Sequence, residues 1–127
     1  MGTVFAFRGR RARKRSRKEA SSGSESSLKR AILQRLEWYP DLKVFCNAQG
    51  GRTYRTGLGP GSSDIIGVLA PIGRFFALEV KVPGKDLMAV QVEWMDQIRK
   101  LGGFAAVVHS PEEADEAYKR ARAGLLG

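Results

Sequence analysis

At 127 residues, of which 43% are apolar, the chain has enough material for one compact domain and leaves no room for two. A single cysteine, Cys46, excludes an internal disulfide and, without partner cysteines, a Cys-type zinc site, so we expect a reducing, intracellular setting. No apolar stretch reaches the length of a membrane span, so we expect a soluble protein with no membrane partner.

The net charge of +9 comes mostly from the N-terminal tail. Residues 1–27 hold eight Lys or Arg and two Glu, a net +6, whereas residues 28–127 hold fourteen cations and eleven acids, a net +3. Eight of the eleven residues from Arg8 to Lys18 are cationic, and such a run repels itself and favours polyanions. We therefore predict a disordered, basic, Ser-rich tail over 1–24 and a folded domain over 25–127. A solubility or targeting role is the alternative interpretation of the tail.

The first predicted element is a helix that runs from Leu28 to about Trp38, where Pro40 ends it. The Ser-rich stretch before it carries residues typical of a helix start. Ser22, followed three residues later by Glu25, fits a capping box, although other serines compete as caps.

The next predicted elements are a strand over 42–48 and a long loop over 49–63 that holds five glycines. Arg52, Tyr54 and Arg55 lie in this loop. Arginines there would bind phosphates bidentately and the tyrosine would stack on a base; solvated loop side chains are the alternative.

Two further strands, 64–69 and 74–82, are predicted on either side of a short turn. Asp64 opens the first of them, and Glu79 and Lys81 lie two residues apart in the second. Side chains alternate faces along a strand, so Glu79 and Lys81 share a face. Burying such charges costs free energy, and hard divalent cations take carboxylate ligands. The pattern favours a metal site built on Asp64 and Glu79, with an ordinary Glu79–Lys81 ion pair as the alternative.

The clearest predicted helix covers 87–101, where the apolar residues fill one broad arc with Gln91 at its centre. A strand over 104–109 follows, and Ser110-Pro111 begins a last helix that ends near Gly124. The strand-helix-strand step implies a parallel pair of strands with a right-handed crossover.

Four motifs follow one another along the predicted domain. They are Gly61-Ser62-Ser63-Asp64-Ile65-Ile66-Gly67, Ala77-Leu78-Glu79-Val80-Lys81, Gln91 with Trp94 on a helix, and Gly102-Gly103 before an apolar strand. As an ordered set over roughly residues 25–115, they resemble the VRR-NUC branch of the PD-(D/E)XK nucleases, although Ser63 stands where the motif has a proline. The resemblance implies an α/β, restriction-endonuclease-like αβββαβα core with a central mixed sheet flanked by helices.

The resemblance also implies an endonuclease that uses Mg²⁺, with Mn²⁺ as a substitute. Asp64, Glu79 and the backbone carbonyl of Val80 would hold the metal. Lys81 would orient or help to deprotonate the attacking water and balance charge on the phosphate. Gln91 matches a glutamine that the family places near the metal site, and hydrogen bonds to backbone at the strand ends are its alternative role.

Two expectations about accessory groups remain. Glu25 corresponds to an acid on the first helix of the family and falls on the same side as Ile32 and Leu36, so it could reach the sheet as an accessory acid. A solvent-exposed capping-box glutamate is the alternative. The tail residues expected to bind nucleic acid are Arg10, Arg11, Arg13, Lys14 and Arg15.

The expected substrate is DNA, with branched or four-way junction DNA favoured by the resemblance. A homodimer is expected, because a small domain offers a short contact surface and a dimer would place two cuts on two strands. We expect an intracellular location, cytoplasmic or nucleoid-associated, in a phage or bacterial setting. The alternative functions are a non-catalytic basic nucleic-acid-binding protein, in which the tail does the work, and an RNA-directed nuclease.

Overall fold

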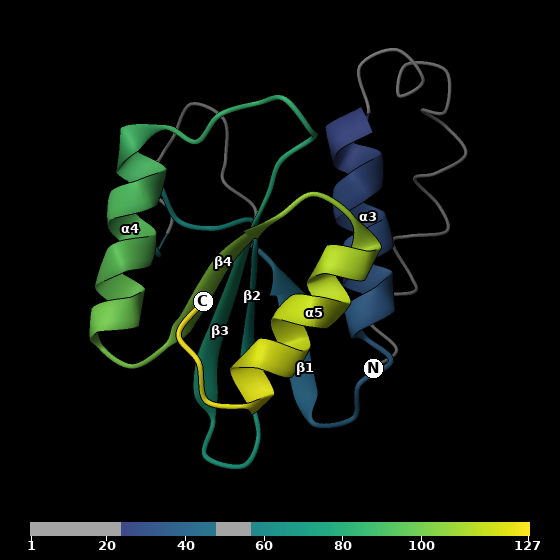
Figure 1. Ribbon diagram of the computed structural model, residues 1–127, viewed down its shortest axis with the longest axis vertical. Coiled ribbons are helices and arrows are strands. Elements are labelled where there is room, and N and C mark those ends of the chain that lie inside the picture. The colour runs from purple at the N-terminus through teal and green to yellow at the C-terminus, as the bar shows by residue number, and fades with distance from the viewer. Residues whose placement is uncertain (1–23, 48–56) are drawn as a thin grey trace.

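A computed structural model describes residues 24–47 and 57–127 as a four-stranded sheet with helices on both faces. Helix α3 (Ser24–Leu36) and helix α5 (Pro111–Arg122) pack side by side on one face, and helix α4 (Ala89–Lys100) covers part of the other (Figure 1). None of the helices in these two ranges is long and apolar enough to cross a membrane.

The sheet is mixed, with its strands in the order β1-β2-β3-β4. The strands are β1 (Leu42–Cys46), β2 (Ile65–Leu69), β3 (Arg74–Val80) and β4 (Phe104–Val108). The first two pairs are antiparallel, whereas β3 and β4 are parallel and are joined through α4. The predicted order of elements, the mixed sheet and the parallel pair are confirmed.

Several residues singled out from the sequence lie outside the described residues. They are Arg10, Arg11, Arg13, Lys14 and Arg15 of the tail, Ser22 of the expected capping box, and Arg52, Tyr54 and Arg55 of the loop. Glu25, the other member of that capping box, lies in the first turn of α3.

Some predicted boundaries are too long. The first helix ends at Leu36 rather than Trp38, which lies in a turn and is 82% exposed. The strand predicted from residue 64 begins at Ile65, and the side chain of Asp64, just before it, accepts a hydrogen bond from a backbone N–H of the neighbouring strand. The strand predicted to residue 82 ends at Val80.

The larger core lies between the sheet and the helices α3 and α5. Phe76 of β3 and Phe104 of β4 stack with ring centroids 5.5 Å apart, and Ile32 and Leu36 of α3 are fully buried beside them. Helix α5 contributes buried alanines, which allow it to approach the sheet closely. This packing fixes the position of α3 relative to β2 and β3.

A polar cluster joins the two helices of this layer at their surface. The rings of Tyr39 and Tyr118 stack with centroids 3.7 Å apart. The Tyr39 hydroxyl donates to Asp115 at 2.8 Å, and the Tyr118 hydroxyl donates to Asp41 at 2.7 Å. Arg35 of α3 pairs with Asp115 as well. These contacts hold the end of α3 against α5.

The second face of the sheet is covered less completely. A small core forms between α4 and the strands β3 and β4, centred on Ala77, Met95 and Ala105. The broad apolar arc predicted for 87–101 is therefore only partly buried, since Met95 is in the core whereas Leu101 is 86% exposed. The arc is wider than the strip of sheet that α4 covers.

The approach of β1 to β2 at Gly67 provides a test of this fold. A Cβ atom at Gly67 would lie 2.7 Å from the backbone oxygen of Lys43 on β1, so we expect Gly67→Ala to force the strands apart. The expected loss in the free energy of unfolding is about 1–3 kcal/mol, measured by urea denaturation. At the matched control Gly57, a Cβ meets no described atom within 4 Å, and Gly57→Ala should change stability by less than about 0.5 kcal/mol. Equal effects of the two substitutions would contradict the β1–β2 register.

Candidate active site

Two carboxylates meet where β2 begins and β3 ends. The antiparallel register pairs Ile65 with Leu78, so the next residues along the two strands, Asp64 and Glu79, stand opposite each other. Both are nearly buried, with exposed fractions of 8% and 3%. The structure therefore brings together the two acids singled out from the sequence.

Asp64 is held from two sides. Its Oδ2 accepts a hydrogen bond from the backbone N–H of Val80 at 2.8 Å, and its Oδ1 lies 3.3 Å from the Nζ of Lys29 on α3. The first contact fixes the carboxylate to the end of β3. The second brings a cation to it from a helix that is distant in the sequence.

Glu79 has one satisfied oxygen and one unsatisfied oxygen. Its Oε2 accepts a hydrogen bond from the Nε2 of Gln91 at 2.9 Å, whereas its Oε1 is buried and has no hydrogen-bond partner in the described part of the chain. A buried acceptor without a partner is rare and costly, and a bound ion is one way to satisfy it.

The surroundings of Glu79 favour its neutral form. Burial is the main cause and the neighbouring Asp64 carboxylate the second, and together they raise the pKa of Glu79 from 4.5 to about 8. The positive charges of Lys81 and Lys29 act in the opposite direction. A further positive charge beside the two acids would lower this pKa and favour the ionised form of Glu79.

Gln91 connects the start of α4 to this pair of acids. Its Oε1 accepts a hydrogen bond from the backbone N–H of Met88 at 2.8 Å, while its Nε2 donates to Glu79. Gln91 therefore lies at the candidate site. Its backbone partner, Met88, directly precedes α4, so the alternative of hydrogen bonds to backbone at the strand ends is not what the structure shows.

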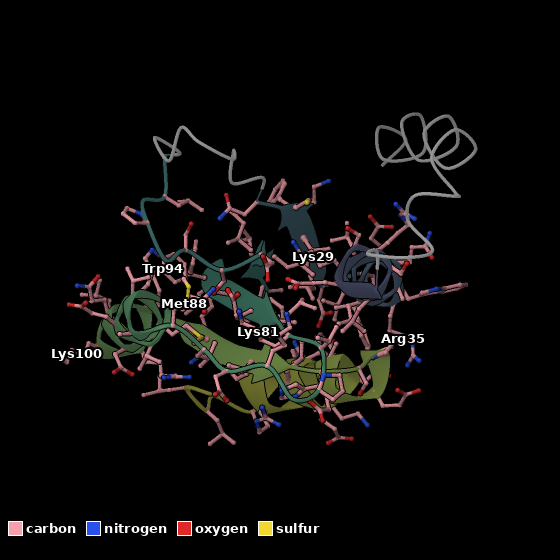
Figure 2. The ribbon with its side chains drawn as sticks, turned by 90° about the horizontal axis from the view of Figure 1, so that it is seen from above. Lys29, Arg35, Lys81, Met88, Trp94 and Lys100 are labelled. Atoms are coloured by element: carbon pink, nitrogen blue, oxygen red, sulfur yellow. The ribbon has the colours of Figure 1, made fainter. Side chains whose placement is uncertain are left out.

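Lys81 follows β3 directly, and its backbone N–H donates to the oxygen of Val108 at 3.1 Å. It is half-buried and lies two residues beyond Glu79, so the alternation of the strand directs both side chains to the same face. Lys81 and Lys29 lie between α3 and α4 (Figure 2). The candidate site thus combines two carboxylates with two ammonium groups.

Lys29 is the site residue that the sequence reasoning missed. Lys29 lies three residues before Ile32 and seven before Leu36, so it is on the buried side of α3. That signal was available in the sequence. Glu25 lies four residues before Lys29 on the same side of the helix, but within the described ranges its side chain makes no hydrogen bond or ion pair.

The segment before β2 is tied to the rest of the domain. The Nδ2 of Asn47 donates to the Oγ of Ser62 at 3.0 Å and to the backbone oxygen of Ser63 at 2.8 Å. The Nε1 of Trp94 on α4 donates to the backbone oxygen of Leu58 at 3.0 Å. These contacts stabilise the position from which Asp64 enters the site.

The described residues offer a cation two carboxylates, with no group of three or more His, Cys, Asp or Glu side chains that could hold a metal. Mg²⁺ is commonly bound through one or two carboxylates and keeps several waters. The hard oxygen donors and the unsatisfied Oε1 of Glu79 therefore fit such an ion.

Comparisons with known proteins point in one direction. A family model described as the VRR-NUC domain matches residues 7–112. A solved structure described as a VRR-NUC domain is 22% identical, covers 75% of this chain and 94% of its own length, and superposes with a TM-score of 0.55. No curated protein matches the chain. The structural match confirms the predicted restriction-endonuclease-like fold.

The raised pKa of Glu79 leads to a pH-dependent stability. Between pH 4.5 and about 8 the folded protein keeps a proton on Glu79 that the unfolded chain loses, so this residue makes folding less favourable as the pH rises. Glutamine does not titrate. In EDTA, the Tm of Glu79→Gln should therefore be only slightly above that of the wild type near pH 5 and several degrees above it at pH 8. The difference at pH 8 corresponds to about 1 kcal/mol or more in the free energy of unfolding.

The control for this measurement is Glu93→Gln, which changes an exposed acid on α4. Its difference in Tm from the wild type should be the same at both pH values. A pH-independent difference for Glu79→Gln would show that Glu79 is already ionised in the folded protein at pH 5.

Proposed function

The chain belongs to the VRR-NUC family, a nuclease-type family, as its ordered motifs predicted, and from this premise we propose that it is a metal-dependent nuclease that hydrolyses phosphodiester bonds in DNA. One observation carries the proposal. Asp64 and Glu79 stand opposite each other at the ends of two neighbouring strands, and Glu79 keeps a buried oxygen without a partner.

In the proposed enzyme Asp64, Glu79 and the backbone carbonyl of Val80 hold Mg²⁺, or Mn²⁺ in its place. When bound, such an ion supplies a water of lowered pKa and stabilises negative charge on the phosphate oxygens. The hydrogen bond from the Val80 N–H to Asp64 supports this assignment, because it fixes one ligand to the chain segment that bears another.

The neighbouring side chains have complementary roles. The side chain of Lys81 either orients the attacking water as an ammonium group or, as the neutral amine, helps to deprotonate it, and its positive charge balances charge on the phosphate. Gln91 fixes the Glu79 carboxylate through its 2.9 Å hydrogen bond and is itself fixed by the backbone of α4. Preorganisation of this kind spares the site from reorganising when charge develops on the phosphate.

The favoured substrate is branched or four-way junction DNA, bound by a homodimer that presents two sites to two strands. The cationic run from Arg8 to Lys18, together with Arg52 and Arg55, would bind the DNA backbone through phosphate contacts that weaken as salt increases. An intracellular location in a phage or bacterial setting, cytoplasmic or nucleoid-associated, agrees with such a substrate.

A second candidate function is favoured by residues 1–27, whose eight cations against two acids would bind nucleic acid without any catalysis. Under this alternative, deleting residues 8–18 abolishes function and changes at Asp64 have no effect. Under the nuclease proposal, the acids are required for cleavage.

We expect Asp64→Asn and Lys81→Met each to reduce cleavage of a labelled four-way junction in Mg²⁺ by about 100-fold or more, because the first removes a ligand of the ion and the second removes the group that acts on the water and the phosphate. Junction binding should persist, and Asp64→Asn should bind at least as tightly as the wild type, since it removes a negative charge near phosphate. The matched controls are Glu116→Gln and Lys119→Met on α5, which remove the same charges from exposed positions and should cleave normally.

Matched linear duplex, and RNA folded into the same branched shape, are tested beside the junction. Cleavage that is identical with and without divalent cations would remove the metal-dependent proposal. Cleavage of RNA in preference to DNA would change the substrate, and equal cleavage of linear duplex would remove the preference for junctions.

A further inference from the structure

Lys29 reaches the candidate site from α3, a helix that contains none of the four motifs. Its Nζ lies 3.3 Å from Asp64 Oδ1, and its side chain is 35% exposed while that of Asp64 is 11% exposed. The fully buried Ile32 and Leu36, one and two turns further along α3, hold this face of the helix against the sheet. The ammonium group is therefore kept beside Asp64 by the packing of the core.

The position of this contact on Asp64 is informative. The other oxygen, Oδ2, already accepts a hydrogen bond from the backbone N–H of Val80, so Oδ1 is the oxygen with more acceptor capacity left for a cation. Lys29 contacts that oxygen. The Asp64 carboxylate is nearly buried, so its attraction for a cation within reach is only weakly screened by salt.

We propose that Lys29 is a positioning residue whose ammonium group is a tethered counter-cation for Asp64, and that a divalent cation must displace it from Oδ1 in order to bind. This inference rests on the proposed function, because it concerns the same cation site. It differs from the role given to Lys81, which acts on water and phosphate.

Displacement gives Lys29 a second role. Its flexible side chain stays anchored on α3, so the freed ammonium group remains near the site and attracts a phosphate of the bound DNA. Removing the charge of Lys29 should then have opposite effects on two ligands, since the divalent cation binds more tightly and DNA binds less tightly. Loss of a merely structural contact would weaken both or leave both unchanged.

The test is a titration of the full-length protein with Mn²⁺ alone, monitored by isothermal titration calorimetry. Lys29→Met keeps the length of the side chain without its charge, and we expect it to bind Mn²⁺ about tenfold more tightly than the wild type, as for a competing charge close to the ion. Lys29→Gln should behave in the same way, and Lys29→Arg, which keeps the charge, should resemble the wild type. The control Lys119→Met removes an exposed lysine of α5 and should leave the affinity unchanged.

Two further measurements complete the test. Without metal, Lys29→Met should have a lower Tm than the wild type, and saturating Mn²⁺ should raise its Tm by more, because tighter binding stabilises the folded state further. With Ca²⁺ in place of Mg²⁺, junction DNA should bind Lys29→Met several-fold more weakly than the wild type.

Mn²⁺ affinity that is equal or weaker in both Lys29→Met and Lys29→Gln would overturn the inference. If the wild type cleaves DNA with Mn²⁺ in that case, the inference fails while the proposed function stands. If neither the wild type nor Lys29→Met binds Mn²⁺ and the wild type does not cleave, the proposed function fails and the inference fails with it.

Discussion

The pairing of β2 with β3 is the constraint on which the candidate site depends. Because Ile65 lies opposite Leu78, Asp64 and Glu79 are placed side by side, where both are nearly inaccessible to solvent. Burial is the main cause of the raised pKa of Glu79, and repulsion by the neighbouring Asp64 carboxylate adds to it. A one-residue shift in register would direct the acids to opposite faces and remove the site.

The groups that compensate this repulsion come from separate parts of the chain. Lys29 belongs to α3, Gln91 to α4, and Lys81 to the segment after β3. The two helices lie on opposite faces of the sheet (Figure 1), so neither can support the acids until it has packed against the strands. The site therefore exists only in the completed fold, and the stability of both cores contributes to its geometry.

The two acids could be identified from the sequence because their placement depends on local features of the chain. Alternation along a strand is enough to place Glu79 and Lys81 on one face, and a short turn between two strands is enough to bring Asp64 next to Glu79. Gln91 was conspicuous as a polar residue within an apolar arc. Each of these signals lies within a few residues of the group that it concerns.

The remaining features depend on packing between distant elements. Lys29 contacts Asp64 only because α3 is held against the sheet by Ile32 and Leu36, and periodicity within α3 does not indicate which strand it meets. The arc over 87–101 was too broad for a similar reason. Periodicity shows which residues share a side of a helix, whereas the amount of sheet available to cover them is set by the whole fold.

A site with two carboxylates has a consequence for the order of binding. A divalent ion that receives few ligands from the protein must complete its shell from water or from substrate phosphate, so on the proposed function the ion and DNA each strengthen the binding of the other. The ammonium group of Lys29 would reinforce this coupling. It opposes the ion when DNA is absent, and it has a phosphate to contact when DNA is present, so its cost to ion binding is largest in the free protein. Tight association of the ion would then coincide with the arrival of its substrate.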